Sequence, residues 1–308
     1  MDANRRKGLW ILLAALLCTA CGKVSDGPLP GPVTGQLSQR IIGMNGYDFN
    51  GVQLNGIDWN GIELNGVSLH GTALEAVLDD GTLVSGEDFI GAEFDAILTD
   101  GSSVRLRIDD IRRHPDSRHQ DVLLYSISAE GDEGVRVPLC HAADGSPVEA
   151  TVVAGRWDFA TGEKISSSTN EATFACVGIG AIAKCVLWGY KPWVSVSGIS
   201  LEDSHQACTR MVRADYCGDG TPHTVNGTPI DIYDPIGVQV PETDWPVDAE
   251  WGPNGALCVN NPRSAHPDDP APGCVAEREL RRADCGVVTD DSLQYGGLLA
   301  DKYQGEQR

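Results

Sequence analysis

The segment LEDSHQACTRMVRADYCGDG, residues 201–220, joins a helical pattern to a turn that contains one cysteine and two glycines. Four apolar residues lie on one face of a helix predicted over residues 201–215, namely Ala207, Cys208, Met211 and Val212. The glycines after the helix predict that the chain turns there. Because one face of the helix is apolar, we expect it to pack against another element, to which Cys208 could be cross-linked.

Several short motifs accompany this segment. In chain order they are KC at 184–185, GYKPW at 189–193, ADYC at 214–217, EW at 250–251 and GALC at 255–258. Together they resemble the ADYC domain, a family of bacterial secreted proteins and lipoproteins, over about residues 174–263. The resemblance implies an exported protein, but it implies no particular activity because none is established for the family.

The N-terminal residues resemble a lipoprotein signal peptide. Basic residues at 5–7 precede the apolar run GLWILLAALL at 8–17, and two small residues stand directly before Cys21. This arrangement resembles the bacterial lipobox, although Cys18 occupies the position where that motif usually has Leu. We therefore expect residues 1–20 to be removed and Cys21 to be acylated. Ordinary signal-peptide cleavage, which would leave Cys21 unmodified, is the alternative.

The residues after Cys21 favour a tether at an outer membrane. Residues 21–40 are rich in Pro, Gly and Ser, and Gly22 in place of Asp resembles the sorting rule for outer-membrane lipoproteins. No apolar run reaches the roughly 20 residues that span a bilayer, so no transmembrane helix is expected. The formal net charge of −21 argues against nucleic acid, which is bound through Lys and Arg. The expected partners are the membrane, through the lipid anchor, and an envelope protein or glycan.

A five-residue repeat occupies residues 41–75. Its large apolar residues are Phe49, Leu54, Trp59, Leu64, Leu69 and Leu74, and a glycine follows two positions after each of the first five. A period of five is neither the helical nor the strand period, so we expect a coil with one side per repeat and a glycine at each corner. The segment resembles the pentapeptide-repeat family, which forms a right-handed β-helix. So short a coil is expected to pack on the neighbouring domain.

The predicted fold is α+β and predominantly β. Residues 76–165 are typical of an antiparallel sheet, because residues 94–98 and 104–108 alternate apolar and polar side chains around an Asp-Gly turn. A short pentapeptide-like coil precedes this β-rich region. A disulfide-rich ADYC domain is expected over residues 166–290, and residues 291–308 are expected to form a frayed C-terminal tail.

Eight of the ten cysteines follow the tether, namely Cys140, Cys176, Cys185, Cys208, Cys217, Cys258, Cys274 and Cys285. An even number in an exported chain predicts four disulfides, for which 105 pairings exist. A bond between Cys176 and Cys185 could close a hairpin. Zinc is the alternative for His205, Cys208, Cys217 and His223, but their spacing follows no standard finger and exported thiols oxidise. We therefore expect no metal.

The candidate catalytic residues are His205, Asp215, Asp219 and His223, which supply two bases and two carboxylates near the ADYC motif. No nucleophile elbow, zinc-protease helix, phosphate loop or dinucleotide motif accompanies them. Residues 215–220 are similar to part of a calcium loop but lack its regular acidic positions and closing Glu. Apart from a minor possibility of calcium, no cofactor is expected.

These observations favour a noncatalytic cell-envelope module that is structural or binds a ligand. The alternatives are an envelope hydrolase with its site in the ADYC region and a calcium-dependent binding protein. Four tryptophans, at positions 188, 193, 245 and 251, could line a glycan groove, although each is expected more readily in a core. Convergence of the four candidate residues in one pocket would favour the hydrolase.

Overall fold

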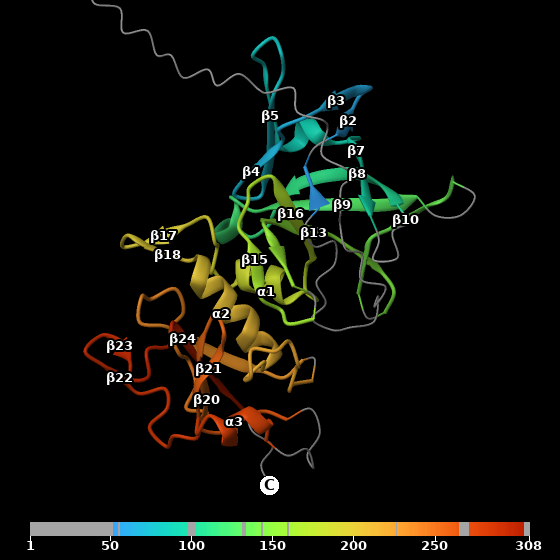
Figure 1. Ribbon diagram of the computed structural model, residues 1–308. Helices are drawn as coiled ribbons and strands as arrows, with labels where there is room; N and C mark the ends of the chain where they lie inside the picture. Colours follow the sequence, from blue (N-terminus) through green and yellow to red (C-terminus); the bar gives the residue numbers. More distant parts are fainter. Residues whose placement is uncertain are drawn as a thin grey trace, which may run out of the picture. The chain divides into compact units, whose positions relative to one another are not determined.

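The computed structural model describes residues 52–54, 56–97, 103–130, 134–142, 144–158, 160–225, 227–264 and 271–304. The predicted signal peptide, Cys21 and the tether lie outside these residues. Where the structure describes the chain, it is predominantly β, as predicted, and its named strands pair antiparallel (Figure 1). No helix in these ranges has the length and apolar composition needed to cross a bilayer.

The largest sheet in the described ranges has nine strands. Eight of them follow in the order β1 (Val52–Gln53), β16 (Glu171–Cys176), β13 (Ala150–Ala154), β9 (Leu123–Glu130), β8 (Ser103–Arg113), β7 (Glu93–Ile97), β2 (Ile57–Trp59) and β3 (Ile62–Leu64), and β10 (Arg136–Pro138) pairs with β9. The predicted hairpin is confirmed, because β7 and β8 pair with Phe94 opposite Leu106. The sequence alternation therefore predicted both the strands and their antiparallel pairing.

One hydrophobic core lies against this sheet. Along β8, Leu106, Ile108 and Ile111 are buried, and a bulge between Ile108 and Asp110 keeps Ile111 on the inner face after the extra residue. The ring of Phe174 on β16 stacks on Phe94, with ring centroids 5.7 Å apart. Aromatic side chains from distant strands therefore hold the centre of this core together.

The repeat is not a coil where the structure describes it. The strands β2 and β3 form an antiparallel hairpin whose turn residues, Asn60 and Gly61, both have positive φ. A separate three-stranded sheet contains β4 (Ser68–His70), β5 (Ala73–Val77) and β6 (Leu83–Ser85). The coil prediction is wrong because a five-residue period also fits a series of hairpins, in which three strand residues alternate with two turn residues. The large apolar residues still face the core, since Leu54, Leu64, Leu69 and Leu74 are buried.

A second core forms around the two longer helices, α1 (Ala181–Leu187) and α2 (Glu202–Arg213). The predicted helix is confirmed as α2, and its four apolar-face residues are buried. This helix packs on a four-stranded sheet in the order β19 (Ile230–Tyr233), β24 (Leu299–Tyr303), β20 (Val247–Gly252) and β21 (Gly255–Val259), whereas α1 contacts α2, β13 and β16. The helix α1 therefore lies between α2 and the larger sheet, and its residues Ile182, Ala183 and Val186 form a separate hydrophobic cluster with Val153 and Trp157.

The C-terminal residues are not a frayed tail as far as the structure describes them. Residues 299–303 form β24, which lies between β19 and β20 in the sheet. Its central residues Leu299, Ala300 and Asp301 are fully buried. The sequence pattern missed this strand because an aspartate at its centre is typical of an exposed segment, whereas here Asp301 is held by buried partners.

The remaining elements are short. They are η1 (Gly86–Phe89), η2 (Ser117–His119) and α3 (Gly273–Glu277), and the hairpins of β11 (Cys140–His141) with β12 (Pro147–Val148), β14 (Arg156–Trp157) with β15 (Lys164–Ser166), β17 (Ser195–Val196) with β18 (Ile199–Ser200), and β22 (Val288–Thr289) with β23 (Ser292–Leu293). They join and cover the two larger sheets.

All eight predicted cysteines form disulfides. The pairs are Cys140–Cys176, Cys185–Cys208, Cys217–Cys274 and Cys258–Cys285. A bond between Cys176 and Cys185 is therefore ruled out, because Cys176 ends β16 beside β11 whereas Cys185 lies on α1 facing α2. Four disulfides indicate an extracellular or cell-envelope protein.

Candidate functional site

The ADYC motif forms the end of α2 and the turn that follows it. Ala214 has a φ of 52°, the left-handed conformation that closes many helices, and is fully buried. The amide of Ala214 donates to Met211 O at 2.9 Å, and that of Asp215 donates to Arg210 O at 3.0 Å. These two bonds satisfy the last carbonyls of the helix. The alanine of the motif therefore turns the chain inside the core, where a side chain larger than a methyl group has little room.

Asp215 organises the turn from inside. Its carboxylate accepts hydrogen bonds from the amide of Asp219 at 3.1 Å and from that of Gly220 at 2.9 Å. The Arg210 guanidinium lies 2.6 Å from the same carboxylate, and both side chains are buried. Arg210 also donates to the carbonyls of Pro253 and Thr161. This ion pair therefore joins the turn to two loops that are distant in sequence.

Tyr216 connects the turn to a buried ionic cluster, which we define as Asp248, Arg263 and Asp301. The Tyr216 hydroxyl donates to Asp248 at 2.7 Å and accepts from the backbone amide of Arg263 at 2.6 Å. Its ring stacks on Trp251, with centroids 5.1 Å apart. The tyrosine of the motif therefore fixes the position of this ionic cluster.

The ionic cluster places two carboxylates around one guanidinium. Arg263 Nε lies 2.7 Å from Asp248 Oδ2, and Arg263 also pairs with Asp301 at 3.2 Å. The Trp251 indole donates to Asp301 at 2.7 Å. Burial raises the pKa of both carboxyls, and repulsion from Asp248 helps to keep the pKa of Asp301 well above its ordinary range.

The glycines of the turn allow two backbones to approach closely. A Cβ on Gly218 would lie 2.0 Å from Asn254 O, and one on Gly220 would lie 2.2 Å from Ala160 O. Both glycines also have positive φ. The last residue of the motif, Cys217, is cross-linked to Cys274 in α3. The segment from Ala214 to Gly220 therefore packs against four separate parts of the chain, namely the loops at 160–161 and 253–254, α3 and the ionic cluster.

The four candidate catalytic residues do not converge. Asp215 and Asp219 share the turn, and the ring of His223 lies 5.9 Å from that of Tyr216 in the same region. His205 lies on α2, about 12 Å along the helix axis from Arg213, the last helical residue before the turn. None of the four lines the cavity beside β5 and β9, the cavity between α1 and the segment before β19, or the cavity between β15 and α2.

The individual environments of these residues differ. Although burial opposes the change, hydrogen bonds from Thr221 and the nearby His223 lower the pKa of Asp219. His205 is fully buried, with Nε2 3.2 Å from Ile182 O and its ring against Trp157. Burial lowers the pKa of His205 to about 3, so the side chain is neutral at physiological pH.

His205 makes folding sensitive to acid. In the unfolded chain His205 takes up a proton below pH 6.5, whereas in the native protein it stays neutral down to about pH 3. Since only the unfolded state gains this proton, the free energy of unfolding is expected to fall by up to about 1.4 kcal/mol per pH unit as pH drops through this window. Urea titrations between about pH 6 and pH 4 should show a shallower dependence for His205→Leu than for the wild type.

His70 provides the control for this experiment, because it is an exposed histidine on β4. The variant His70→Gln is expected to keep the pH dependence of the wild type. An unchanged slope in His205→Leu would show that His205 is not the group that takes up the proton.

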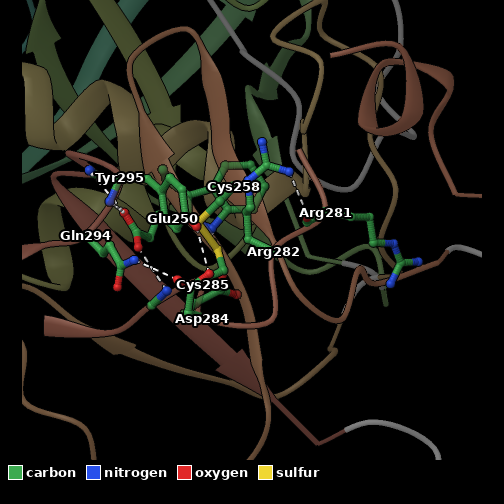
Figure 2. The surroundings of a disulfide bond; sticks show 12 residues. Glu250, Cys258, Arg281, Arg282, Asp284, Cys285, Gln294 and Tyr295 are labelled. Carbon is green, nitrogen blue, oxygen red and sulfur yellow. Dashed lines mark hydrogen bonds between the residues drawn. A yellow bond between two sulfur atoms is a disulfide. The ribbon is translucent and has the colours of Figure 1, made fainter. Parts of the chain in front are cut away.

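Among the described residues, one group has the spacing of a metal site, namely Glu250, Cys258 and Cys285 (Figure 2). The two sulfurs form a disulfide, and the Glu250 carboxylate accepts amide hydrogens from Gly286, Tyr295 and Gly297. This arrangement orders the backbone of the loop and leaves no thiolate for a metal. The zinc alternative fails for a similar reason, because Cys208 and Cys217 belong to different disulfides.

Fold and site together define a disulfide-bonded, predominantly β protein whose sequence motif packs around a buried ionic cluster. The model of the ADYC domain family matches residues 86–265, more than half of the chain. The chain therefore belongs to the ADYC domain family. The matched range includes most of the larger sheet and ends beside Arg263, whereas the sequence led us to expect the domain at residues 166–290. No curated protein and no solved structure matches the chain.

Sequence reasoning missed three of the residues at the centre of this site. Asp248, Arg263 and Asp301 are widely separated, and no motif connects them. An acid inside an otherwise strand-like pattern, such as Asp301 in LLADKY at 298–303, is the signal that could have indicated a buried partner.

Proposed function

We propose that the protein is a noncatalytic cell-envelope module, anchored to the outer membrane by lipid on Cys21. The main observation in favour of a noncatalytic role is that the polar groups of the motif bind other groups of the protein. Asp215 is bound to Arg210 and two backbone amides, and Tyr216 to Asp248 and the amide of Arg263. A catalytic group needs an accessible face for its substrate, and these groups are buried.

The anchoring part rests on the sequence. A basic segment, an apolar run and two small residues precede Cys21, and a tether of about twenty residues follows it. The four disulfides are consistent with this proposal, because such bonds persist outside the cytosol. A rigid body on a lipid-bound tether can reach partners near the membrane surface while its own core stays closed to solvent.

Fatty-acid labelling tests the anchor. In bacteria that express the full-length chain, the wild type is expected to incorporate labelled palmitate and to sediment with membranes. Cys21→Ser should lose the label and be released, because its hydroxyl replaces the thiol to which the lipid is attached. Mass spectrometry of the N-terminal peptide would identify the modified residue.

Cys18→Ser is the matched control, since it changes the other cysteine of the same segment. This variant is expected to remain labelled and membrane-bound. Labelling that persists in Cys21→Ser, or a wild-type protein that carries no lipid, would contradict the anchor.

A further inference from the structure

A cavity of about 360 Å³ lies beside β5 and β9, far in sequence from the ADYC turn. Its volume is within the range of small-ligand sites in proteins. The wall includes Gly86 and Glu87 of η1, Arg113 at the end of β8, and Asp121 and Leu123 where β9 begins. Because η1 contacts β5, β6 and β8, the cavity lies where the three-stranded sheet meets the larger sheet.

Hydrogen bonds of one buried threonine hold this wall in place. The Thr72 hydroxyl donates to Asp121 O at 3.2 Å and accepts from the amide of Leu123 at 2.8 Å. The Tyr125 hydroxyl donates to Thr72 O at 2.6 Å. In the ladder of β8 and β9, Arg113 lies opposite Leu123. The start of β9 is therefore fixed against both β5 and β8, and the cavity is formed without a ligand.

The wall contains a cation and an anion that do not pair with each other. The Arg113 guanidinium donates to Gln120 O at 2.9 Å, and it forms no ion pair with any carboxylate in the described ranges. The Glu87 carboxylate has no hydrogen-bond or ion-pair partner among the same residues. Asp121 differs, because its carboxylate lies 2.5 Å from Lys191 Nζ. A guanidinium has five N–H donors, so Arg113 can still bind a second acceptor.

This pair of charges determines the kind of ligand. An anion that bound Arg113 would be repelled by Glu87, and a cation that bound Glu87 would be repelled by Arg113. A ligand with one charge of each sign can satisfy both groups, and a carboxylate suits the planar guanidinium best. Ala73 and Leu123 add apolar surface for a side chain.

We propose that this cavity binds a free α-amino acid in its zwitterionic form. The carboxylate of the amino acid accepts hydrogen bonds from Arg113, and its ammonium donates to Glu87. Its side chain lies against Ala73 and Leu123. This inference goes beyond the proposed envelope role and does not depend on the lipid anchor, so each can fail separately.

Leucine and two analogues are suitable probes, because each analogue lacks one of the two charges. Leucinamide keeps the ammonium, whereas 4-methylpentanoate keeps the carboxylate. Calorimetry at pH 7 on the full-length protein in detergent is expected to show leucine binding about 10- to 100-fold more tightly than either analogue. This is the range for one hydrogen bond to a charged group.

Two variants assign the charges to their partners. Arg113→Gln is expected to remove the preference for leucine over leucinamide and to keep the preference over 4-methylpentanoate. Glu87→Gln should do the reverse, because it removes the partner of the ammonium. Both side chains are exposed, so we expect both variants to fold, which thermal unfolding would establish.

Arg118→Gln is the matched control. Arg118 is another exposed arginine, it pairs with Asp116, and it does not line the cavity. This variant should bind leucine and both analogues like the wild type.

The proposal would be overturned by equal affinity for leucine and either analogue. An unchanged preference over leucinamide in folded Arg113→Gln, or no detectable binding of leucine at millimolar concentration, would overturn it too. None of these results would alter the fractionation of the same proteins with membranes, which tests the anchor.

Discussion

Arg263→Met is expected to lower the free energy of unfolding by about 3–5 kcal/mol. The substitution keeps most of the side-chain volume but removes the guanidinium that lies between Asp248 and Asp301. Both carboxyls are fully buried, so neither can regain hydration while the protein stays folded. It also removes the bond that Arg263 donates to Met211 O at 2.5 Å. Urea unfolding with the disulfides intact would measure the change.

Arg282→Met is the matched control, because Arg282 is exposed and its guanidinium lies 6.0 Å from the ring centre of Tyr295. Its expected effect is within about 0.5 kcal/mol. Adding Asp301→Asn to Arg263→Met should recover part of the loss, because one buried acid disappears. A loss below about 1 kcal/mol in Arg263→Met alone would contradict the role assigned to the ionic cluster.

Gly218→Ala is expected to cost about 2–5 kcal/mol, the sum of two effects. The residue has a φ of +69°, which costs an alanine roughly 1–2 kcal/mol. In addition, its Cβ would lie 2.0 Å from Asn254 O, so one backbone must move, and overpacking of this kind costs roughly 1–3 kcal/mol. Thermal and urea unfolding would measure the loss.

Gly198→Ala separates the two effects. Gly198 lies in the turn between β17 and β18 with a φ of +82°, and a Cβ there meets nothing within 4 Å. It should therefore show the conformational cost alone. Equal losses in the two variants would contradict the close approach of residues 218 and 254.

The elements that the sequence predicted correctly are those that depend on neighbouring residues. The hairpin of β7 and β8 follows from alternation, and α2 follows from the spacing of its apolar residues. The repeat misled the prediction because its five-residue period suits both a coil and a series of hairpins. Which of these forms depends on what covers the apolar side chains. In this protein the larger sheet covers them, and the Tyr125 hydroxyl on β9 donates to Thr72 O at 2.6 Å.

In the candidate site, too, the sequence predicted some features and the tertiary structure decided others. The motif identified the family and directed attention to Asp215 and Tyr216, but it could not show whether their side chains face solvent or the core. His205 illustrates the difficulty, because the sequence places a histidine on a helix but does not show whether its side chain binds a substrate or packs against Trp157. Burial decides between these roles, and burial is a property of the assembled chain.

By itself, the sequence determined that eight cysteines would pair, that the chain would be mostly β, and where its clearest hairpin and helix lie. These features follow from composition and from contacts between near neighbours. Only the tertiary structure decided which cysteines pair, that β24 lies inside a sheet, and that Asp248 and Asp301 share Arg263. Each of these depends on groups far apart in sequence, whose pairing is set by the removal of water from a common core.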